Sequence, residues 1–558
     1  MAMWRYRIGL SVASLMLAMN AEVWAGDVGT QESATGTAVI DESDHSAPVD
    51  YGYGPGVRKK PAASTARALA TPLAATTSAT AASSASVPTG GSTANTQGVF
   101  GAPVSWPIIG LHEVLLPDGR VMNYGTDETG QQGAQFVYDI WDPTMGTGED
   151  SHLTLPNGTG TDIFCSAQSV LPNGEVLITG GDATVKGVRN YSTEQAEIFS
   201  PSTNELRPIG SMTYARWYPT AIDRPNGEVV ILGGRQDFDI DAPTPEIYNA
   251  STGWRTLAGA SSVPALGFPD GNWYYPKAFL MSSGKIFVLG NWTYTYSLNP
   301  NGNGSITQLA SQVLPGDYQL PSIMYAPGKV LSLRQNKKVD LVNINNNPPV
   351  VTTTADMDQM RYWANATVLA DGKVLVTGGS SVANELTDVA YSAQIWTPSK
   401  GTWTTAASAS KPRLYHSIAL LLPDGSVLTG AGGAPGPVNN LNAEIYYPPY
   451  LYKKNGSGQP APRPTILSAS SSVGVGKTLT ATVGTSDTIN RVTMVRTGSV
   501  THSFNPDQRF IPVSFTQSGQ TISVTVPSNS NVALPGYYML FVFKNGIPSV
   551  AKIVHVTL

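Results

Sequence analysis

One pattern of apolar and polar positions recurs along the chain. It consists of an apolar run, a polar turn that ends in glycine, and a β-branched run that often closes on Gly-Gly, as in residues 171–181, 224–234 and 369–379. An Asp-Gly or Asn-Gly turn supplies the positive φ that a tight reversal between two strands requires. Each copy of the pattern therefore predicts a β-hairpin.

The pattern occurs seven times, and its turn glycines are 44 to 57 residues apart. They are Gly119, Gly174, Gly227, Gly284, Gly328, Gly372 and Gly425. A period of about 50 residues is typical of kelch blades, which cannot bury their faces alone and close into a ring. The sequence therefore predicts a seven-bladed kelch-type β-propeller over residues 98–460.

The repeat ends near residue 462, and short strands separated by turns follow, for example at 478–483 and 521–526. This spacing predicts an immunoglobulin-like β-sandwich over residues 461–558. Composition agrees with an all-β protein, because 56 of the 558 residues are Gly and 41 are Pro, and only 13% are charged. An average globular chain has roughly 25% charged residues.

The N-terminus contains two segments that we expect to lie outside the folded part. Residues 1–25 combine Arg5 and Arg7 with an apolar run over 8–19 and small residues near Ala25, which predicts a secretory signal peptide. The run is shorter than the roughly 20 residues that span a bilayer. We expect a secreted or periplasmic protein without a membrane span. Residues 26–97 are rich in Ala, Ser, Thr and Pro, which predicts a disordered linker.

Charge and cysteine usage exclude several classes. The net charge is −5 and no basic stripe is present, so nucleic acid is not an expected partner. The single cysteine, Cys165, excludes an intrachain disulfide framework and a thiolate-clustered zinc or iron–sulfur site.

Candidate chemistry emerges from the position of residues within the repeat. Cys165, Tyr218 and His416 each lie nine residues before a turn glycine. If that strand is the innermost of each blade, these side chains converge near the central axis. Tyr415 precedes His416, and adjacent residues of a regular strand face opposite ways. Both could reach one site only if the chain bends where the strand begins.

Two aromatic residues share this register. Tyr275 and Trp363 also lie nine residues before their turn glycines. We expect them to form part of the wall of the same pocket.

Four short stretches are recognisable as a set. They are Phe-Cys-Ser at 164–166, Ala-Arg-Trp-Tyr-Pro at 215–219, Arg-Leu-Tyr-His-Ser at 413–417 and Thr-His-Ser-Phe-Asn-Pro at 501–506. In this order they resemble the copper radical oxidases, the galactose oxidase and glyoxal oxidase family. The resemblance covers about residues 100–558 and includes the stretch 534–542.

The resemblance implies a mononuclear copper site. Tyr218 would be an equatorial ligand joined to Cys165 by a thioether bond, and His416 and His502 would supply the equatorial nitrogens. Tyr415 would be the axial ligand and the general base. Imidazole nitrogens with oxygen donors suit Cu(II).

The implied activity is two-electron oxidation of a primary alcohol or a small hydrated aldehyde, with O2 reduced to hydrogen peroxide. The expected partners are the small-molecule substrate and O2, no organic cofactor is needed, and the protein is expected to be a monomer. Where galactose oxidase has a sugar-binding arginine this chain has Trp273-Tyr274, and at the tryptophan that covers the cross-linked tyrosine it has Gln236. Together with the Arg216-Trp-Tyr-Pro stretch, this favours the glyoxal oxidase branch. Trp106 is one candidate for the missing cover.

Two other functional classes stay open at this point. One is a non-catalytic kelch-type protein that binds carbohydrate or another surface. The other is a metal-independent propeller hydrolase, which would need clustered carboxylates in the shared register, where the sequence places none.

Overall fold

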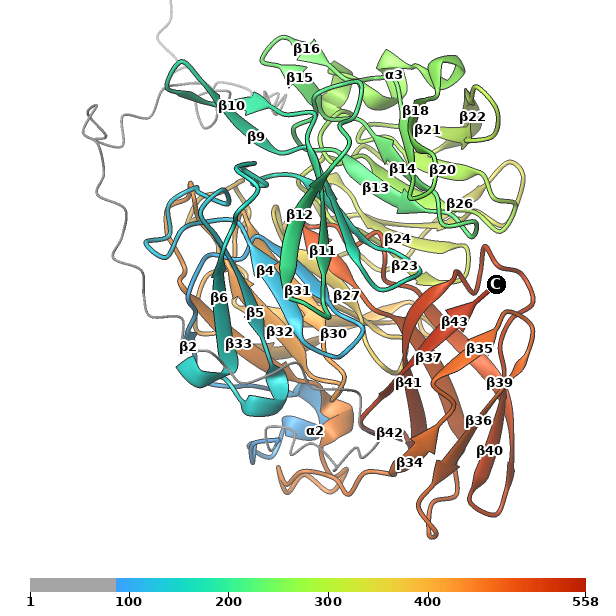
Figure 1. Ribbon diagram of the computed structural model, residues 1–558. Coiled ribbons are helices and arrows are strands. Elements are labelled where there is room, and N and C mark those ends of the chain that lie inside the picture. Colours follow the sequence, from blue (N-terminus) through green and yellow to red (C-terminus); the bar gives the residue numbers. More distant parts are fainter. Residues whose placement is uncertain (1–86) are drawn as a thin grey trace, which may run out of the picture. The chain divides into compact units, whose positions relative to one another are not determined.

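The computed structural model describes residues 87–558, and nearly all regular structure in them is β-strand (Figure 1). The predicted signal peptide and residues 26–86 of the predicted linker lie outside the described residues. Within 87–558, no helix is long and apolar enough to cross a membrane.

Seven antiparallel sheets follow one another along the chain as blades. The first blade contains β3 (His112–Leu115), β4 (Val121–Tyr124), β5 (Val137–Trp141) and β6 (His152–Pro156). The second contains β7 (Ala167–Val170), β8 (Val176–Thr179), β11 (Ala196–Ser200) and β12 (Glu205–Ile209). The third contains β13 (Thr220–Asp223), β14 (Val229–Leu232), β17 (Glu246–Asn249) and β18 (Gly253–Thr256). The fourth blade contains β19 (Lys277–Leu280), β20 (Ile286–Leu289), β21 (Tyr294–Asn299) and β22 (Ser305–Gln312). The fifth contains β23 (Ser322–Ala326), β24 (Lys329–Leu333), β25 (Val339–Asn343) and β26 (Val350–Thr353). The sixth blade contains β27 (Asn365–Val368), β28 (Val374–Thr377), β29 (Ser392–Thr397) and β30 (Thr402–Ser408). The seventh contains β31 (Ser417–Leu421), β32 (Val427–Ala431) and β33 (Asn442–Tyr447).

The seven turn glycines explain the hairpins that open each blade. All of them have positive φ, from 65° at Gly328 to 92° at Gly119, which glycine adopts without a steric penalty. The inner strands β8 and β28 are buried along their whole length, whereas the outer strand β12 contains only exposed and half-buried residues. This difference explains why β8 and β28 begin with uninterrupted apolar runs, Val-Leu-Ile and Val-Leu-Val, in the sequence.

The N-terminal end of the described chain completes the seventh blade. β1 (Val99–Phe100) and β2 (Val104–Ser105) both pair with β33, in the registers Val99 to Tyr447 and Val104 to Ala443. The short helix α2 (Ala94–Gln97) precedes them, within the range predicted as linker. The ring is therefore closed by a strand from its own beginning.

The C-terminal region forms a nine-stranded sheet that curls around its own apolar core. Its strands are β34 (Ile466–Ala469), β35 (Ser472–Gly474), β36 (Thr478–Val483), β37 (Arg491–Arg496), β39 (Phe510–Ser518), β40 (Thr521–Thr525), β41 (Gly536–Lys544), β42 (Ile547–Pro548) and β43 (Lys552–Thr557). The predicted all-β architecture, a seven-bladed propeller followed by an immunoglobulin-like domain, is confirmed.

One strand of the C-terminal region joins the propeller instead. β38 (Ser499–Thr501) pairs with β3 in the register His112 to Thr501, so it becomes the innermost strand of the first blade. His502 follows directly, and this pairing carries it to the inner edge of the blade.

Two hairpins and a second short helix extend from the blades. The hairpins are β9 (Asp182–Val185) with β10 (Val188–Ser192), and β15 (Arg235–Asp237) with β16 (Ile240–Asp241). The helix is α3 (Val263–Leu266).

Candidate metal centre

Five residues just before innermost strands share an uncommon backbone conformation. They are Cys165, Tyr218, Tyr275, Trp363 and His416, with φ of 58°, 64°, 37°, 62° and 66°. Such a conformation costs a non-glycine residue roughly 1–3 kcal/mol and clusters at functional sites. The bend also breaks the alternation of side chains along a regular strand. As a result, the adjacent rings of Tyr415 and His416 lie on the same side and stack, with centroids 3.7 Å apart.

Backbone hydrogen bonds tie three of these positions together across neighbouring blades. The amide of Tyr218 donates to the carbonyl oxygen of Cys165 at 3.0 Å, and the amide of Tyr275 donates to that of Tyr218 at 2.9 Å. Residues at equivalent positions of the repeat therefore lie at the same height along the axis of the propeller.

A sulfur atom and two imidazoles meet at this level. The Cys165 Sγ and one ring nitrogen each of His416 and His502 all lie within 4.8 Å of one another, and the Cys165 Sγ is 3.7 Å from His502 Nε2. All three side chains are buried. The second histidine arrives from the C-terminal region through β38, 337 residues after the cysteine.

Two phenols complete the cluster. The hydroxyl oxygens of Tyr218 and Tyr415 are 2.5 Å apart. The Tyr218 ring lies beside the same imidazole as the Cys165 thiol, because its centroid is 5.1 Å from that of His502. The structure thus brings together all five residues that the sequence nominated as ligands or cross-link partners.

The imidazoles are held in orientations that suit a metal. His416 Nδ1 lies 2.7 Å from the carbonyl oxygen of Gly433, which can only accept, so this nitrogen carries the proton. His502 Nδ1 lies 2.6 Å from the hydroxyl of Thr501. Metal-binding histidines commonly use one ring nitrogen in this way and present the other to the ion. Two imidazole nitrogens with two phenol oxygens form a donor set that fits copper.

Burial governs the acidity of the cluster. It raises the pKa of the Cys165 thiol and of the Tyr218 and Tyr415 hydroxyls well above their ordinary values. The three groups are therefore neutral without a bound metal ion. A bound metal ion acts in the opposite direction, because it stabilises the phenolate forms.

Two aromatic residues that the sequence did not nominate also lie in the cluster. The Trp217 ring stacks on the Tyr218 ring at a centroid distance of 4.0 Å and an angle of 29°. Tyr274 lies 4.2 Å from the same ring, and its hydroxyl donates to the Tyr415 hydroxyl at 3.2 Å. Both residues directly precede a register position, as Tyr415 does, and that adjacency was the signal that could have identified them.

Trp217 takes the covering place for which Trp106 was a candidate. Trp106 packs instead against Trp141 and His152, and its indole nitrogen donates to Asn123 at 2.7 Å. The side chain of Gln236 donates to the backbone of the β15–β16 hairpin, at Asp241 O. The cover therefore comes from the residue beside Tyr218 in the chain.

The two predicted wall residues lie against the cluster. Tyr275 stacks on His502 with centroids 4.5 Å apart, and its hydroxyl donates to the carbonyl oxygen of Ser166 at 2.9 Å. The Trp363 ring lies 4.4 Å from the Tyr415 ring.

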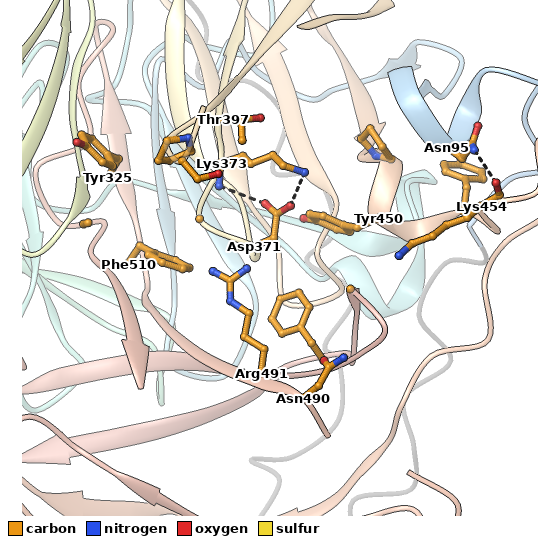
Figure 2. A pocket seen from close by; sticks show the side chains of 18 residues that line it. Asn95, Tyr325, Asp371, Lys373, Thr397, Tyr450, Lys454, Asn490, Arg491 and Phe510 are labelled. Atoms are coloured by element: carbon orange, nitrogen blue, oxygen red, sulfur yellow. Dashed lines mark hydrogen bonds and ion pairs between the residues drawn. The ribbon is translucent and has the colours of Figure 1, made fainter. Parts of the chain in front are cut away.

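A cavity of about 590 Å³ lies elsewhere, between the sixth blade and the C-terminal region (Figure 2). Asp371 and Lys373, an ion pair at 2.9 Å, line it from the blade, and Arg491 and Phe510 line it from the C-terminal strands. None of the nominated site residues reaches this cavity. The residues that the sequence nominated therefore lie in the buried cluster and not at this cavity.

Comparisons with known proteins agree with this arrangement. The family described as "Glyoxal oxidase N-terminus" matches residues 151–344, and "Galactose oxidase-like, Early set domain" matches residues 463–556. The chain is 30% identical over 495 residues to a galactose oxidase of Gibberella zeae, covering 82% of this chain and 71% of that protein.

Two further matches extend the comparison. An aldehyde oxidase GLOX of Vitis pseudoreticulata is 27% identical over 442 residues, covering 70% of this chain and 81% of that protein. A solved structure of a fungal alcohol oxidase of the AA5 family, in complex with copper, superposes with a TM-score of 0.74 at 25% identity. That match covers 83% of this chain and 100% of the other.

Proposed function

This chain belongs to the copper radical oxidase family of galactose oxidase and glyoxal oxidase, and we propose that it is an exported oxidase that converts a primary alcohol or a hydrated aldehyde to the next oxidation level and reduces O2 to hydrogen peroxide. The observation that carries the proposal is the convergence of one thiol, two phenols and two imidazoles in a single buried cluster. The relatives named above are oxidases, and nothing observed favours a non-catalytic binding protein.

Four side chains of the cluster would hold the copper ion. They are the two histidines, through their Nε2 atoms, and Tyr218 and Tyr415, through their hydroxyl oxygens. Copper, when bound, supplies one-electron redox chemistry between its two oxidation states. The chain would supply the acceptor for the second electron of the substrate and the acceptor for its proton.

Cys165 and Tyr218 would provide that second electron acceptor, as a radical on the cross-linked Tyr218 ring. Joining Sγ to the ring carbon beside the hydroxyl removes one hydrogen from the thiol and one from the ring, and O2 accepts both. A sulfur substituent stabilises the radical that forms when the tyrosine loses an electron. The thiol and the Tyr218 ring both lie against the His502 imidazole, which supports this bond.

Tyr415 would accept the proton of the substrate hydroxyl as general base. Hydrogen bonds from Tyr218 and Tyr274 lower its pKa, against the larger effect of burial. The Tyr218 radical would then take a hydrogen atom from the substrate carbon, and the one electron left on the substrate would pass to the copper ion, so that the carbonyl product forms.

The walls of the cluster favour a small aldehyde hydrate over a hexose. Trp217, Tyr274 and Trp363 surround the two phenols with aromatic rings. A sugar needs hydrogen-bonding partners for several hydroxyls, whereas a small geminal diol needs only the copper-side donors and acceptors. Similarity to an aldehyde oxidase of Vitis pseudoreticulata supports the same substrate class.

A peroxide-coupled substrate panel tests this proposal. Copper-loaded wild type should oxidise small aldehydes faster than galactose. Tyr218→Phe should reduce peroxide formation to background while the fold persists, because one buried hydroxyl usually contributes only about 1–3 kcal/mol. Tyr214→Phe, which removes a phenol outside the cluster, should match wild type. Full turnover by Tyr218→Phe would refute the radical assignment.

A further inference from the structure

Trp217, the ring that covers Tyr218, is paired with a cation. The amide of Trp217 donates to the carbonyl oxygen of Arg235 at 2.9 Å, and the amide of Arg235 donates back to that of Trp217 at 3.0 Å. Directly opposed residues of an antiparallel pair project on the same side. The bridge therefore places the guanidinium beside the indole.

The guanidinium lies among aromatic rings. Its central carbon is 4.2 Å from the centroid of Trp217, 4.7 Å from Phe238 and 5.6 Å from Trp273. The side chain is buried, and its Nη2 donates to the carbonyl oxygen of Asn190 at 3.2 Å. An arginine stays charged in such surroundings. A permanent positive charge is thus fixed against the indole.

The same indole contacts the ring that the proposed function oxidises, since Trp217 and Tyr218 stack at 4.0 Å. A radical on Tyr218 could take one electron from Trp217, which would leave a tyrosinate and an indole radical cation. No bond forms or breaks in this transfer. The radical would then lie on a ring that does not carry out the reaction.

We infer that Arg235 confines the radical to Tyr218 and Cys165 by raising the oxidation potential of Trp217. This inference rests on the proposed function. A neutral indole attracts the guanidinium through its ring electrons. An oxidised indole would place a second positive charge at the same short distance, where burial weakens screening. Both effects oppose loss of an electron from Trp217.

The charge of Arg235 is effective beyond the indole. It lowers the pKa of the Cys165 thiol, although burial is the larger effect and raises that pKa overall. The guanidinium therefore changes the electrostatic potential at the sulfur of the cross-link. It affects the reaction through Trp217, because it does not contact the reacting atoms.

The test measures the radical itself in copper-loaded, cross-linked protein. Each variant is oxidised, the oxidant is removed, and the decay of the radical absorbance is followed. Arg235→Gln should decay at least about tenfold faster than wild type, which corresponds to about 59 mV of driving force for one electron. Arg235→Lys should recover most of the lifetime, because the charge is kept. Arg207→Gln removes the same charge from a side chain that is 54% exposed and should decay as wild type.

A second pair of variants isolates the route through the indole. In the Trp217→Phe background, Arg235→Gln should cause no further acceleration, because phenylalanine is not oxidised by a tyrosyl radical. Equal decay of Arg235→Gln and wild type, or equal acceleration in both backgrounds, would overturn the inference. Should Arg235→Gln fail to fold, Arg235→Met carries the same comparison. Absence of the radical in wild type would instead refute the proposed function.

Discussion

In the proposed function, the hydroxyl of Tyr415 is the group that accepts the proton of the substrate. It lies 2.5 Å from the Tyr218 hydroxyl and accepts from the Tyr274 hydroxyl at 3.2 Å. Both hydrogen bonds favour its ionised form, whereas the bond between Tyr218 and Tyr415 raises the pKa of Tyr218. Of the two phenols, Tyr415 is therefore the one whose phenolate these hydrogen bonds stabilise, and the phenolate is the form that accepts a proton.

Tyr274→Phe should destabilise the Tyr415 phenolate, the form that accepts the proton, without removing it. Loss of one hydrogen bond typically costs about 0.5–1.5 kcal/mol, so we expect kcat to fall about three- to tenfold with the best aldehyde substrate. The Cys165–Tyr218 cross-link should still form. Steady-state peroxide production checks this, with Tyr214→Phe as the matched control. An unchanged kcat would show that Tyr274 only packs in the cluster.

Repeat arithmetic could predict the register residues Cys165, Tyr218 and His416, because equivalent positions in a propeller recur with the blade. It could not predict Trp217 or Tyr274. Periodicity assumes that neighbours on a strand face opposite ways, and the positive φ at Tyr218 and Tyr275 breaks that rule.

At the level of secondary structure, the site depends on strands that pair with partners far away in the sequence. β38 pairs with β3 through His112 and Thr501, nearly 400 residues apart, and β1 completes the last blade. The seven hairpins were predictable because their turns are local. The two long-range pairings were not, since no local pattern specifies the partner of a short strand.

A carboxyl pair links the β9–β10 hairpin to the start of the second blade. Asp162 and Asp182 form an isolated bridge, in which the amide of Asp182 donates to the carbonyl oxygen of Asp162 at 2.9 Å, and both are buried. Burial raises the pKa of Asp162 to about 7. In the unfolded chain it is about 3.9. The folded protein therefore holds a proton there that the unfolded chain has lost.

Asp162→Asn should change the pH dependence of stability. The stabilising contribution of the protonated carboxyl is complete below about pH 4 and is lost as the pH rises through about 7. The melting temperature of the variant relative to wild type should therefore increase between pH 4 and 7. Thermal unfolding of both proteins across that range measures the difference. A difference that does not vary with pH would contradict the assignment.

For the whole molecule, the cluster is complete only when the propeller and the C-terminal region are folded together. The propeller supplies the thiol, both phenols and one imidazole, and β38 supplies His502. Arg496 of the C-terminal region reinforces the contact, because it pairs with Asp223 of the third blade and with Asp507. The reactive residues are thereby held in a buried core, away from the 590 Å³ cavity.

Intact-mass analysis of purified, copper-loaded protein tests the central claim most directly. The cross-link between Cys165 and Tyr218 should make the chain two hydrogen atoms lighter than its uncross-linked mass, and no thiol should react with an alkylating reagent under denaturing conditions. A chain of full mass with an alkylated Cys165, after copper loading in the presence of O2, would contradict the account.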